Sequence, residues 1–246
     1  MKFGIGLFGM QTHGELPYRH PDLYKNSLEQ VRLAESVGFD SAWISEHHFL
    51  DDGYCPSPAV AAAAMAAVTS RIRIGSAGII LPLQNPVRVA EDAAVVDNIS
   101  NGRFDLGVVL GYRKEEYDGM GVPMIERPSR MEEGLEVLGK ALSGEKFSYE
   151  GKRFKYENTT VTPKPVQKPV PLYVGAFEEP AIRRAGRFGL PLLIGPGRTV
   201  SMVRDTLGYY NDEAKKAGKD PDAVEHILLR ETFVSPDRDK AIEGGT

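Results

Sequence analysis

Short apolar runs alternate with longer helical patterns along this chain, and this alternation restricts the fold more than any other sequence feature. Helix signals separate the runs, such as Ser57 and Pro58 before an alanine-rich stretch. Near-continuous apolar runs predict parallel strands, and seven such units favour a (β/α)8 TIM barrel over an open sheet. The predicted strands are 2–8, 41–46, 71–82, 103–111, 170–176, 190–195 and 225–235.

The C-terminal end of the sequence departs from this pattern. The chain stops at Thr246 with no eighth strand and no closing helix. We therefore expect one barrel domain over 1–246 that is incomplete at its C-terminal end. Residues 144–168 interrupt the alternation, and their period-two pattern predicts a small hairpin excursion.

The composition excludes several classes of protein. The 246 residues carry a net charge of −4, so we expect neither nucleic acid nor an anionic membrane as a partner. The single cysteine, Cys55, excludes an intrachain disulfide. No apolar run approaches about 18 residues and the N-terminus lacks a signal-peptide pattern, which together predict a cytoplasmic protein.

Two adjacent histidines follow the second predicted strand. Glu46, His47 and His48 stand at its C-terminal end, which is where a TIM barrel carries its chemistry. Adjacent residues on an extended segment point to opposite sides, so the two imidazoles are poorly placed to bind one metal ion. No other motif has the spacing of zinc ligands, and we expect no metal. A functional histidine and ordinary packing both remain open from the residues alone.

Other predicted strand ends carry residues that suit a flat, anionic ligand. The run 75–82 joins small residues to a strand end, which allows either close approach of a ligand or tight strand packing. Arg113 and Lys114 follow strand 103–111 and could meet a phosphate, although isolated loop charges are more often only solvated. The segment 195–201 leads into a helix N-terminus, a second candidate anion site.

Four sequence blocks resemble the bacterial luciferase-like flavin monooxygenase family. They are EHHF at 46–49, LPLQNPVRVAED at 81–92, SNGRF at 100–104 and GYRKEEY at 111–117. The resemblance runs from residue 2 to residue 235. It implies a TIM barrel that binds reduced FMN, or in some branches the deazaflavin F420, at the C-terminal ends of its strands.

The resemblance also implies roles for individual residues. His47 would lie beside the flavin and act as a base, whereas His48 would pair with Glu91 at a subunit interface. The implied homodimer uses the helices 57–70 and 85–100. The implied cofactor contacts are Glu46, Ala77, Gly78, Val109, Leu110, Tyr112, Arg113, Gly175, Leu193 and Gly195.

The chain departs from the family pattern around the expected phosphate site. Val109 replaces a cysteine near the flavin and Leu110 replaces a phosphate-binding arginine, so Arg113 is the candidate substitute. A non-prolyl cis peptide is implied between Ala77 and Gly78. The residues after the fifth strand also differ from the family, namely Phe177, Glu178 and Ala181.

The expected activity is that of a two-component monooxygenase. Reduced FMN from a separate flavin reductase would react with O2 and oxygenate a small organic substrate, with His47 managing protons. The alternatives are an F420-dependent oxidoreductase that transfers hydride and a non-catalytic flavin-binding homologue. The polar loop 9–22 carries candidate substrate contacts at His13, Tyr18 and His20.

Overall fold

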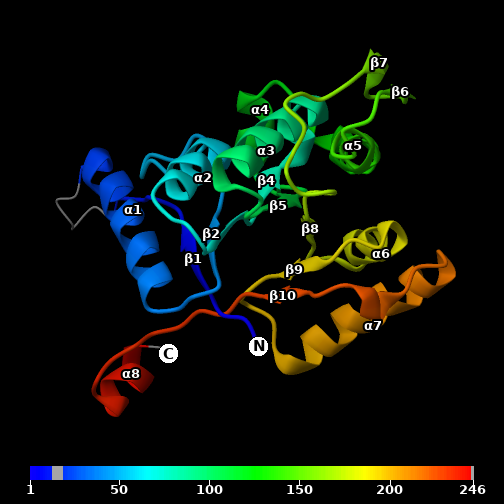
Figure 1. Ribbon diagram of the computed structural model, residues 1–246. Helices are drawn as coiled ribbons and strands as arrows, with labels where there is room; N and C mark the ends of the chain where they lie inside the picture. Colours follow the sequence, from blue (N-terminus) through cyan, green and yellow to red (C-terminus); the bar gives the residue numbers. More distant parts are fainter. Residues whose placement is uncertain (13–18, 245–246) are drawn as a thin grey trace. The chain divides into compact units, whose positions relative to one another are not determined.

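The computed structural model describes residues 1–12 and 19–244, which fall into two compact units, Met1–Tyr173 and Val174–Thr246. Each unit has its own parallel strands and its own helices (Figure 1). The strand β8 (Leu172–Gly175) begins in the first unit and ends in the second.

The first unit contains neighbouring parallel strands whose spatial order follows the chain, β1 to β2 to β3 to β5. The predicted strand 71–82 is divided, because its second part forms β4, which pairs with the C-terminal half of β5, and then a short 3₁₀ turn. Since all these strands are parallel, their C-terminal ends meet at one edge of the sheet. The elements are β1 (Gly4–Phe8), β2 (Ser41–Ile44), β3 (Arg73–Ser76), β4 (Ile79–Ile80), η1 (Leu81–Leu83) and β5 (Phe104–Val109).

Helices follow the strands of this unit as the sequence predicts, with one addition. Asn85 begins α3 by accepting hydrogen bonds from the N–H groups of Val87 and Arg88, at 2.9 and 3.4 Å. The short helix α4, directly after β5, is absent from the predicted pattern. The helices are α1 (His20–Ser36), α2 (Pro58–Ala67), α3 (Pro86–Ser100), α4 (Lys114–Gly119), η2 (Met124–Glu126) and α5 (Arg127–Ala141).

Close packing and buried polar links hold the strands of the first unit together. Gly75 lies against the ring of Trp43, and a Cβ atom at Gly75 would stand 2.3 Å from it. Ser76 Oγ donates to the carbonyl oxygen of Gly107 and accepts from its N–H, both at 2.9 Å. These contacts pack β3 tightly against β2 and β5 near the C-terminal ends of the strands.

An antiparallel pair, β6 (Phe147–Glu150) and β7 (Lys155–Thr159), lies inside the segment 144–168. Glu133 on α5 accepts hydrogen bonds from the three consecutive N–H groups of residues 152–154, at 2.8 to 3.1 Å. One carboxylate thus fixes the turn of the hairpin to α5.

The second unit has three parallel strands in the order β8, β9, β10. Its two long helices pack closely, because Gly186 has no side chain: a Cβ atom there would stand 2.5 Å from the carbonyl oxygen of Tyr210. The elements after β8 are α6 (Glu179–Phe188), β9 (Leu192–Ile194), α7 (Val200–Lys216), η3 (Pro221–Ala223), β10 (Ile227–Leu228) and α8 (Arg238–Gly244).

The last strand is much shorter than predicted. The apolar run 225–235 suggests a full strand, but only Ile227 and Leu228 pair with β9. Leu228 stands opposite Ile194, the last residue of β9, so the rest of the run extends beyond the end of its partner strand. Phe233 and Val234 are accordingly exposed.

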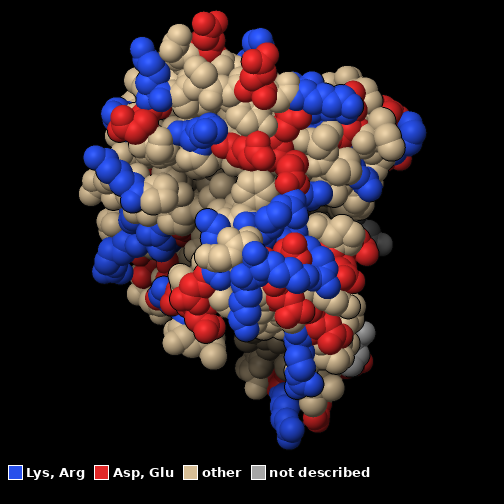
Figure 2. Space-filling model, turned by 90° about the vertical axis from the view of Figure 1, so that its right-hand side faces the viewer, with Lys and Arg blue, Asp and Glu red and all other residues tan. Residues whose placement is uncertain are grey.

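Acidic, basic and uncharged side chains are interspersed over the face shown in Figure 2, in keeping with the small net charge. Among the described residues, no helix is both long and apolar enough to cross a membrane.

Candidate active site

The predicted site residues of the first unit gather at the C-terminal ends of neighbouring strands. Ile44 on β2 stands opposite Ser76 on β3, and Ile80 on β4 stands opposite Val109 on β5. The EHH segment, the Ala77–Gly78 pair and the residues after β5 therefore leave the sheet at the same edge.

Glu46 and His48 form a buried pair in this unit. Glu46 Oε1 lies 2.6 Å from His48 Nε2, and Glu46 Oε2 accepts the N–H of Ile80 at 3.0 Å. Both side chains are almost fully buried. One carboxylate oxygen of Glu46 thus binds within the segment after β2, and the other holds that segment against β4.

His47 is held by a carboxylate that the sequence did not single out, Glu116 on α4. His47 Nδ1 lies 2.8 Å from Glu116 Oε1, and the same oxygen accepts the backbone N–H of His48 at 3.0 Å. Glu116 is completely buried, whereas 21% of the His47 side chain is exposed. No motif in the sequence distinguishes Glu116 from its neighbour Glu115. Only the geometry of α4 turns one inward and the other outward.

Two aromatic rings pack edge-on against His47. The ring of Tyr54 lies 4.7 Å away and that of Tyr112 lies 5.9 Å away, measured between centroids. The Tyr54 hydroxyl shares a short hydrogen bond with Ser45 Oγ. Burial raises the pKa of Tyr54, whereas Tyr112 is largely exposed. The ring of Tyr54 is therefore held beside the imidazole, and the ring of Tyr112 borders it while remaining accessible.

The peptide bond between Ala77 and Gly78 is cis, as the family resemblance implies. A Cβ atom at Gly78 would stand 2.8 Å from the carbonyl oxygen of Gly107, so this glycine lets β4 pack against β5. Ala77, in contrast, is partly exposed at the strand edge. The close packing of β4 thus requires glycine at position 78, Ala77 is partly exposed, and a cofactor contact at either residue stays a prediction.

The residues after β5 combine apolar surface with one cation. Val109 and Leu110 are partly exposed, and the Leu110 carbonyl oxygen accepts the Tyr117 hydroxyl at 2.5 Å. Arg113 Nε is buried without a hydrogen-bond partner among the described residues, and Arg113 Nη2 lies 3.9 Å from the exposed Glu115. This guanidinium, with an unbonded Nε and a long contact to an exposed carboxylate, fits a flat ligand that carries a phosphate.

The other predicted contacts lie in the second unit. Gly175 at the end of β8 stands opposite Leu193 on β9. The ring of Phe177 covers Gly195, where a Cβ atom would stand 2.4 Å from it. Phe177 also accepts a hydrogen bond from Arg198 through its carbonyl oxygen. Within this unit, Gly195 therefore makes room for an aromatic side chain.

The remaining predicted residues are less informative. His13 and Tyr18 lie outside the described residues, and His20 is exposed, with Nε2 3.3 Å from the carbonyl oxygen of Asp52. In the described ranges, no three His, Cys, Asp or Glu side chains cluster as metal ligands. Glu91, the predicted interface partner of His48, lies 3.5 Å from Arg88.

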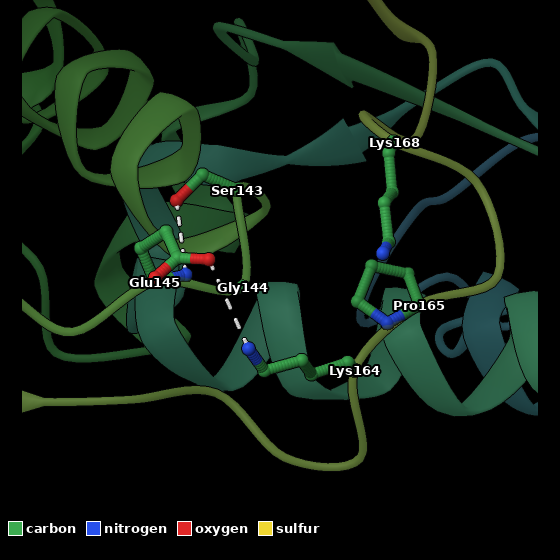
Figure 3. A pocket seen from close by; sticks show the side chains of 6 residues that line it. All are labelled: Ser143, Gly144, Glu145, Lys164, Pro165 and Lys168. Atoms are coloured by element: carbon green, nitrogen blue, oxygen red, sulfur yellow. Dashed lines mark hydrogen bonds and ion pairs between the residues drawn. The ribbon is translucent and has the colours of Figure 1, made fainter.

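A separate surface pocket lies where the 144–168 excursion leaves and rejoins the first unit (Figure 3). Lys164 Nζ lies 3.8 Å from Glu145 Oε1, and Ser143 Oγ accepts the Glu145 N–H at 3.1 Å. Lys168 points toward Pro165 (Figure 3). These groups largely partner one another, so their contacts link the two ends of the excursion.

Curated relatives cover nearly the whole chain. An uncharacterised protein of Sinorhizobium fredii is 34% identical over 218 residues, 87% of this chain and 61% of that protein. The alkanal monooxygenase alpha chain of Photorhabdus laumondii is 29% identical over 99% of this chain and 67% of its own length. The oxygenase component of the flavin-dependent trigonelline monooxygenase of Acinetobacter baylyi is 28% identical, covering 89% of this chain and 61% of its own length. The chain thus spans about two thirds or less of these relatives.

Solved structures show the same fold. The monooxygenase RslO1 of Streptomyces bottropensis superposes with a TM-score of 0.90 and 28% identity, over 100% of this chain and 75% of that one. An F420-dependent secondary alcohol dehydrogenase superposes with a TM-score of 0.83 and 25% identity, over 98% and 72%. This likeness confirms the predicted class, a luciferase-like TIM barrel. The signature of the luciferase-like monooxygenases matches residues 1–244, and the chain therefore belongs to that family.

Proposed function

We propose that this chain is a flavin-dependent monooxygenase acting on a small organic substrate, with His47 as its catalytic residue. The observation that carries the proposal is the setting of His47. Its imidazole is partly exposed and packs against two aromatic rings at the C-terminal edge of parallel strands. Imidazole exchanges protons near neutral pH, which suits it to the proton steps of such a reaction.

The residues of the first unit fit a flavin-type cofactor. Ala77 and Val109 offer small and apolar surface for a flat ring system, and Arg113 offers a guanidinium for its phosphate. Bound reduced FMN would be the group that reacts with O2, because no side chain can carry out that chemistry. The chain's own residues would orient the substrate, exclude water and move protons at His47 Nε2.

The proposed working partner is a separate flavin reductase. The trigonelline monooxygenase relative is named an oxygenase component, which supports a two-component arrangement. A reductase of this kind would deliver FMN already reduced.

F420-dependent hydride transfer is the second candidate function. The likeness to the F420-dependent secondary alcohol dehydrogenase favours this function, because 98% of the present chain superposes on that structure. Hydride transfer would need no O2, so oxygen consumption separates the two functions.

Oxygen uptake with chemically reduced FMN and a panel of aldehydes and ketones tests the proposal. We expect substrate-dependent uptake and an oxygenated product. In His47→Ala, product formation should fall on the order of 10²- to 10⁴-fold, while Lys140→Ala, an exposed change on α5, should leave it unchanged. Unchanged turnover in His47→Ala would remove the assigned role. Reduction of a ketone by reduced F420 without O2 would favour the second function, and flavin binding without turnover would indicate a non-catalytic homologue.

We also propose that the chain forms a homodimer through α2 and α3. These helices pack on each other and carry exposed apolar side chains, namely Val60 at 70%, Val95 at 42% and Ile99 at 46% exposure. Apolar side chains that gather on one pair of helices are typical of a subunit interface. Glu91 lies on α3, and in the proposed dimer Glu91 and His48 would stand close to the interface.

A further inference from the structure

We propose that Glu116 is a positioning residue that fixes neutral His47 in its Nδ1–H tautomer and leaves Nε2 free to accept a proton. The consequence for turnover rests on the proposed function, but the tautomer itself does not. An ionised carboxylate only accepts hydrogen bonds. With Glu116 Oε1 at 2.8 Å from His47 Nδ1, the imidazole proton must therefore be on Nδ1.

The contact between Glu116 and His47 fixes the orientation of the imidazole. Glu116 is completely buried, and its Oε1 receives both the His47 ring and the His48 backbone N–H. The ring and the backbone of the histidine pair are thus held at a single oxygen atom. Glu116 Oε2 is buried and has no partner among the described residues. A hydrogen bond to a buried, charged acceptor is shorter and stronger than a neutral one.

His48 provides an internal contrast. Its Nε2 lies 2.6 Å from Glu46 Oε1, so the same reasoning places its proton on Nε2. Two neighbouring histidines are therefore held in opposite tautomers by two buried carboxylates. Only His47 is partly exposed, with 21% of its side chain accessible.

The neighbouring rings do not compete for the His47 proton. Tyr54 and Tyr112 approach the imidazole edge-on, at centroid distances of 4.7 and 5.9 Å. The Tyr54 hydroxyl is already bonded to Ser45. The orientation of His47 thus depends on Glu116.

The test is nitrogen NMR of protein labelled with ¹⁵N at its histidine rings, recorded without any cofactor. The pH is set well above the ordinary imidazole pKa of about 6.5, so that the neutral ring predominates. The His47 and His48 signals are assigned from His47→Gln and His48→Gln. We expect Nδ1–H for His47 and Nε2–H for His48 in the wild-type chain. An Nε2–H tautomer at His47 would overturn the proposal without any variant at Glu116.

Two substitutions separate positioning from general packing. Glu116→Ala removes the acceptor, and the Nε2–H form of His47 should rise until both tautomers are detected. Glu116→Gln should retain the Nδ1–H form, because the amide oxygen can take the place of Oε1 and the amide nitrogen the place of the unpartnered Oε2. Asp118→Asn on the same helix, where the Asp118 side chain pairs with exposed Lys114, should change neither signal. An unchanged tautomer in folded Glu116→Ala, or its loss in folded Glu116→Gln, would contradict the proposal. If Glu116→Ala does not fold, the wild-type and Glu116→Gln spectra still decide.

Turnover gives a second readout. Glu116 is completely buried and contacts His47, so Glu116→Ala should lower kcat on the order of 10²-fold with little change in KM, and Glu116→Gln should restore part of the loss. A rise in KM at constant kcat would show that Glu116 shapes the ligand site and does not act through His47. If the NMR tautomers are as expected but neither the wild type nor any variant turns over substrate, the proposed function is refuted and the tautomer assignment stands.

Discussion

Glu35, at the end of α1, holds the start of β3 through a single carboxylate. Its Oε1 accepts the N–H groups of Ser70, Arg71 and Ile72 at 2.6 to 2.9 Å. Burial alone would raise its pKa, but the three hydrogen bonds outweigh burial and lower the pKa from 4.5 to about 2.

This shift predicts an acid-dependent contribution to stability. Because the folded-state pKa lies below the unfolded value, the contribution is fully present above pH 4.5 and is lost as the pH falls toward about 2. Urea unfolding of Glu35→Gln at neutral pH should show a loss of about 1–3 kcal/mol in the free energy of unfolding. The difference from wild type should shrink as the pH is lowered through this range.

Glu29→Gln is the matched control, because Glu29 lies on the same helix and pairs only loosely with exposed Lys25 at 3.9 Å. It should change the stability by less than about 0.5 kcal/mol. A Glu35→Gln variant that tracks Glu29→Gln at every pH would refute the assigned role.

Among single residues, the sequence predicts those that carry recognisable chemistry. His47 could be identified because it follows a strand and sits in a family motif. Glu116 could not, because two adjacent glutamates precede Tyr117 and nothing in the sequence says which one turns inward. The choice depends on α4, a helix of one and a half turns that periodicity does not reveal.

Among the elements, the contact between β4 and β5 depends on a glycine. A Cβ atom at Gly78 would stand 2.8 Å from the carbonyl oxygen of Gly107, a backbone atom that cannot move without shifting β5. Gly78→Ala should therefore cost about 1–3 kcal/mol in thermal or urea unfolding.

Gly139 on α5 provides the opposite case. Apart from adjacent residues and the backbone of its own helix, no atom lies within 4 Å of a Cβ built at this helical position, so Gly139→Ala should add about 0.5–1 kcal/mol of stability. Equal effects of the two substitutions would show that close strand packing does not determine the residue at Gly78.

The elements differ in how far the sequence predicts them. Some runs fall where the apolar pattern places them: β5 (Phe104–Val109) lies inside the predicted run 103–111. The run 225–235 does not form the predicted strand, because an apolar run predicts burial but does not predict how long its partner strand is. Its strand ends after Leu228, at the edge of the second unit.

For the whole molecule, the proposed dimer makes a prediction about α2. Val60 is 70% exposed, so a charge there would be tolerated in a monomer but would oppose burial in an interface. Val60→Glu should shift the sedimentation equilibrium from dimer to monomer at a protein concentration where wild type is dimeric. Lys140→Glu, on the exposed side of α5, should not. A wild-type chain that sediments as a monomer at all concentrations would refute the interface.

The fold class of the molecule follows from the sequence because seven strand–helix units leave few other arrangements, and the likeness to RslO1 confirms it. The family follows from four motifs in order. The binding residues are harder to predict, because they depend on exposure. The resemblance implies Gly78 and Gly195 as cofactor contacts, and a Cβ atom at either position would meet the chain's own atoms within its unit.

The central claim is that the strand edge bearing His47 and Arg113 binds a flavin through its phosphate as well as its ring. Equilibrium titration of the chain with FMN and with riboflavin, followed by flavin fluorescence, tests it most directly. Wild type should bind FMN on the order of 10-fold or more tightly than riboflavin, because a hydrogen bond to a charged group contributes about 1.5–3 kcal/mol. Arg113→Ala should bind the two flavins about equally, with unchanged riboflavin affinity. A wild-type chain that binds neither FMN nor F420, or an Arg113→Ala chain that keeps the full preference for FMN, would contradict the account.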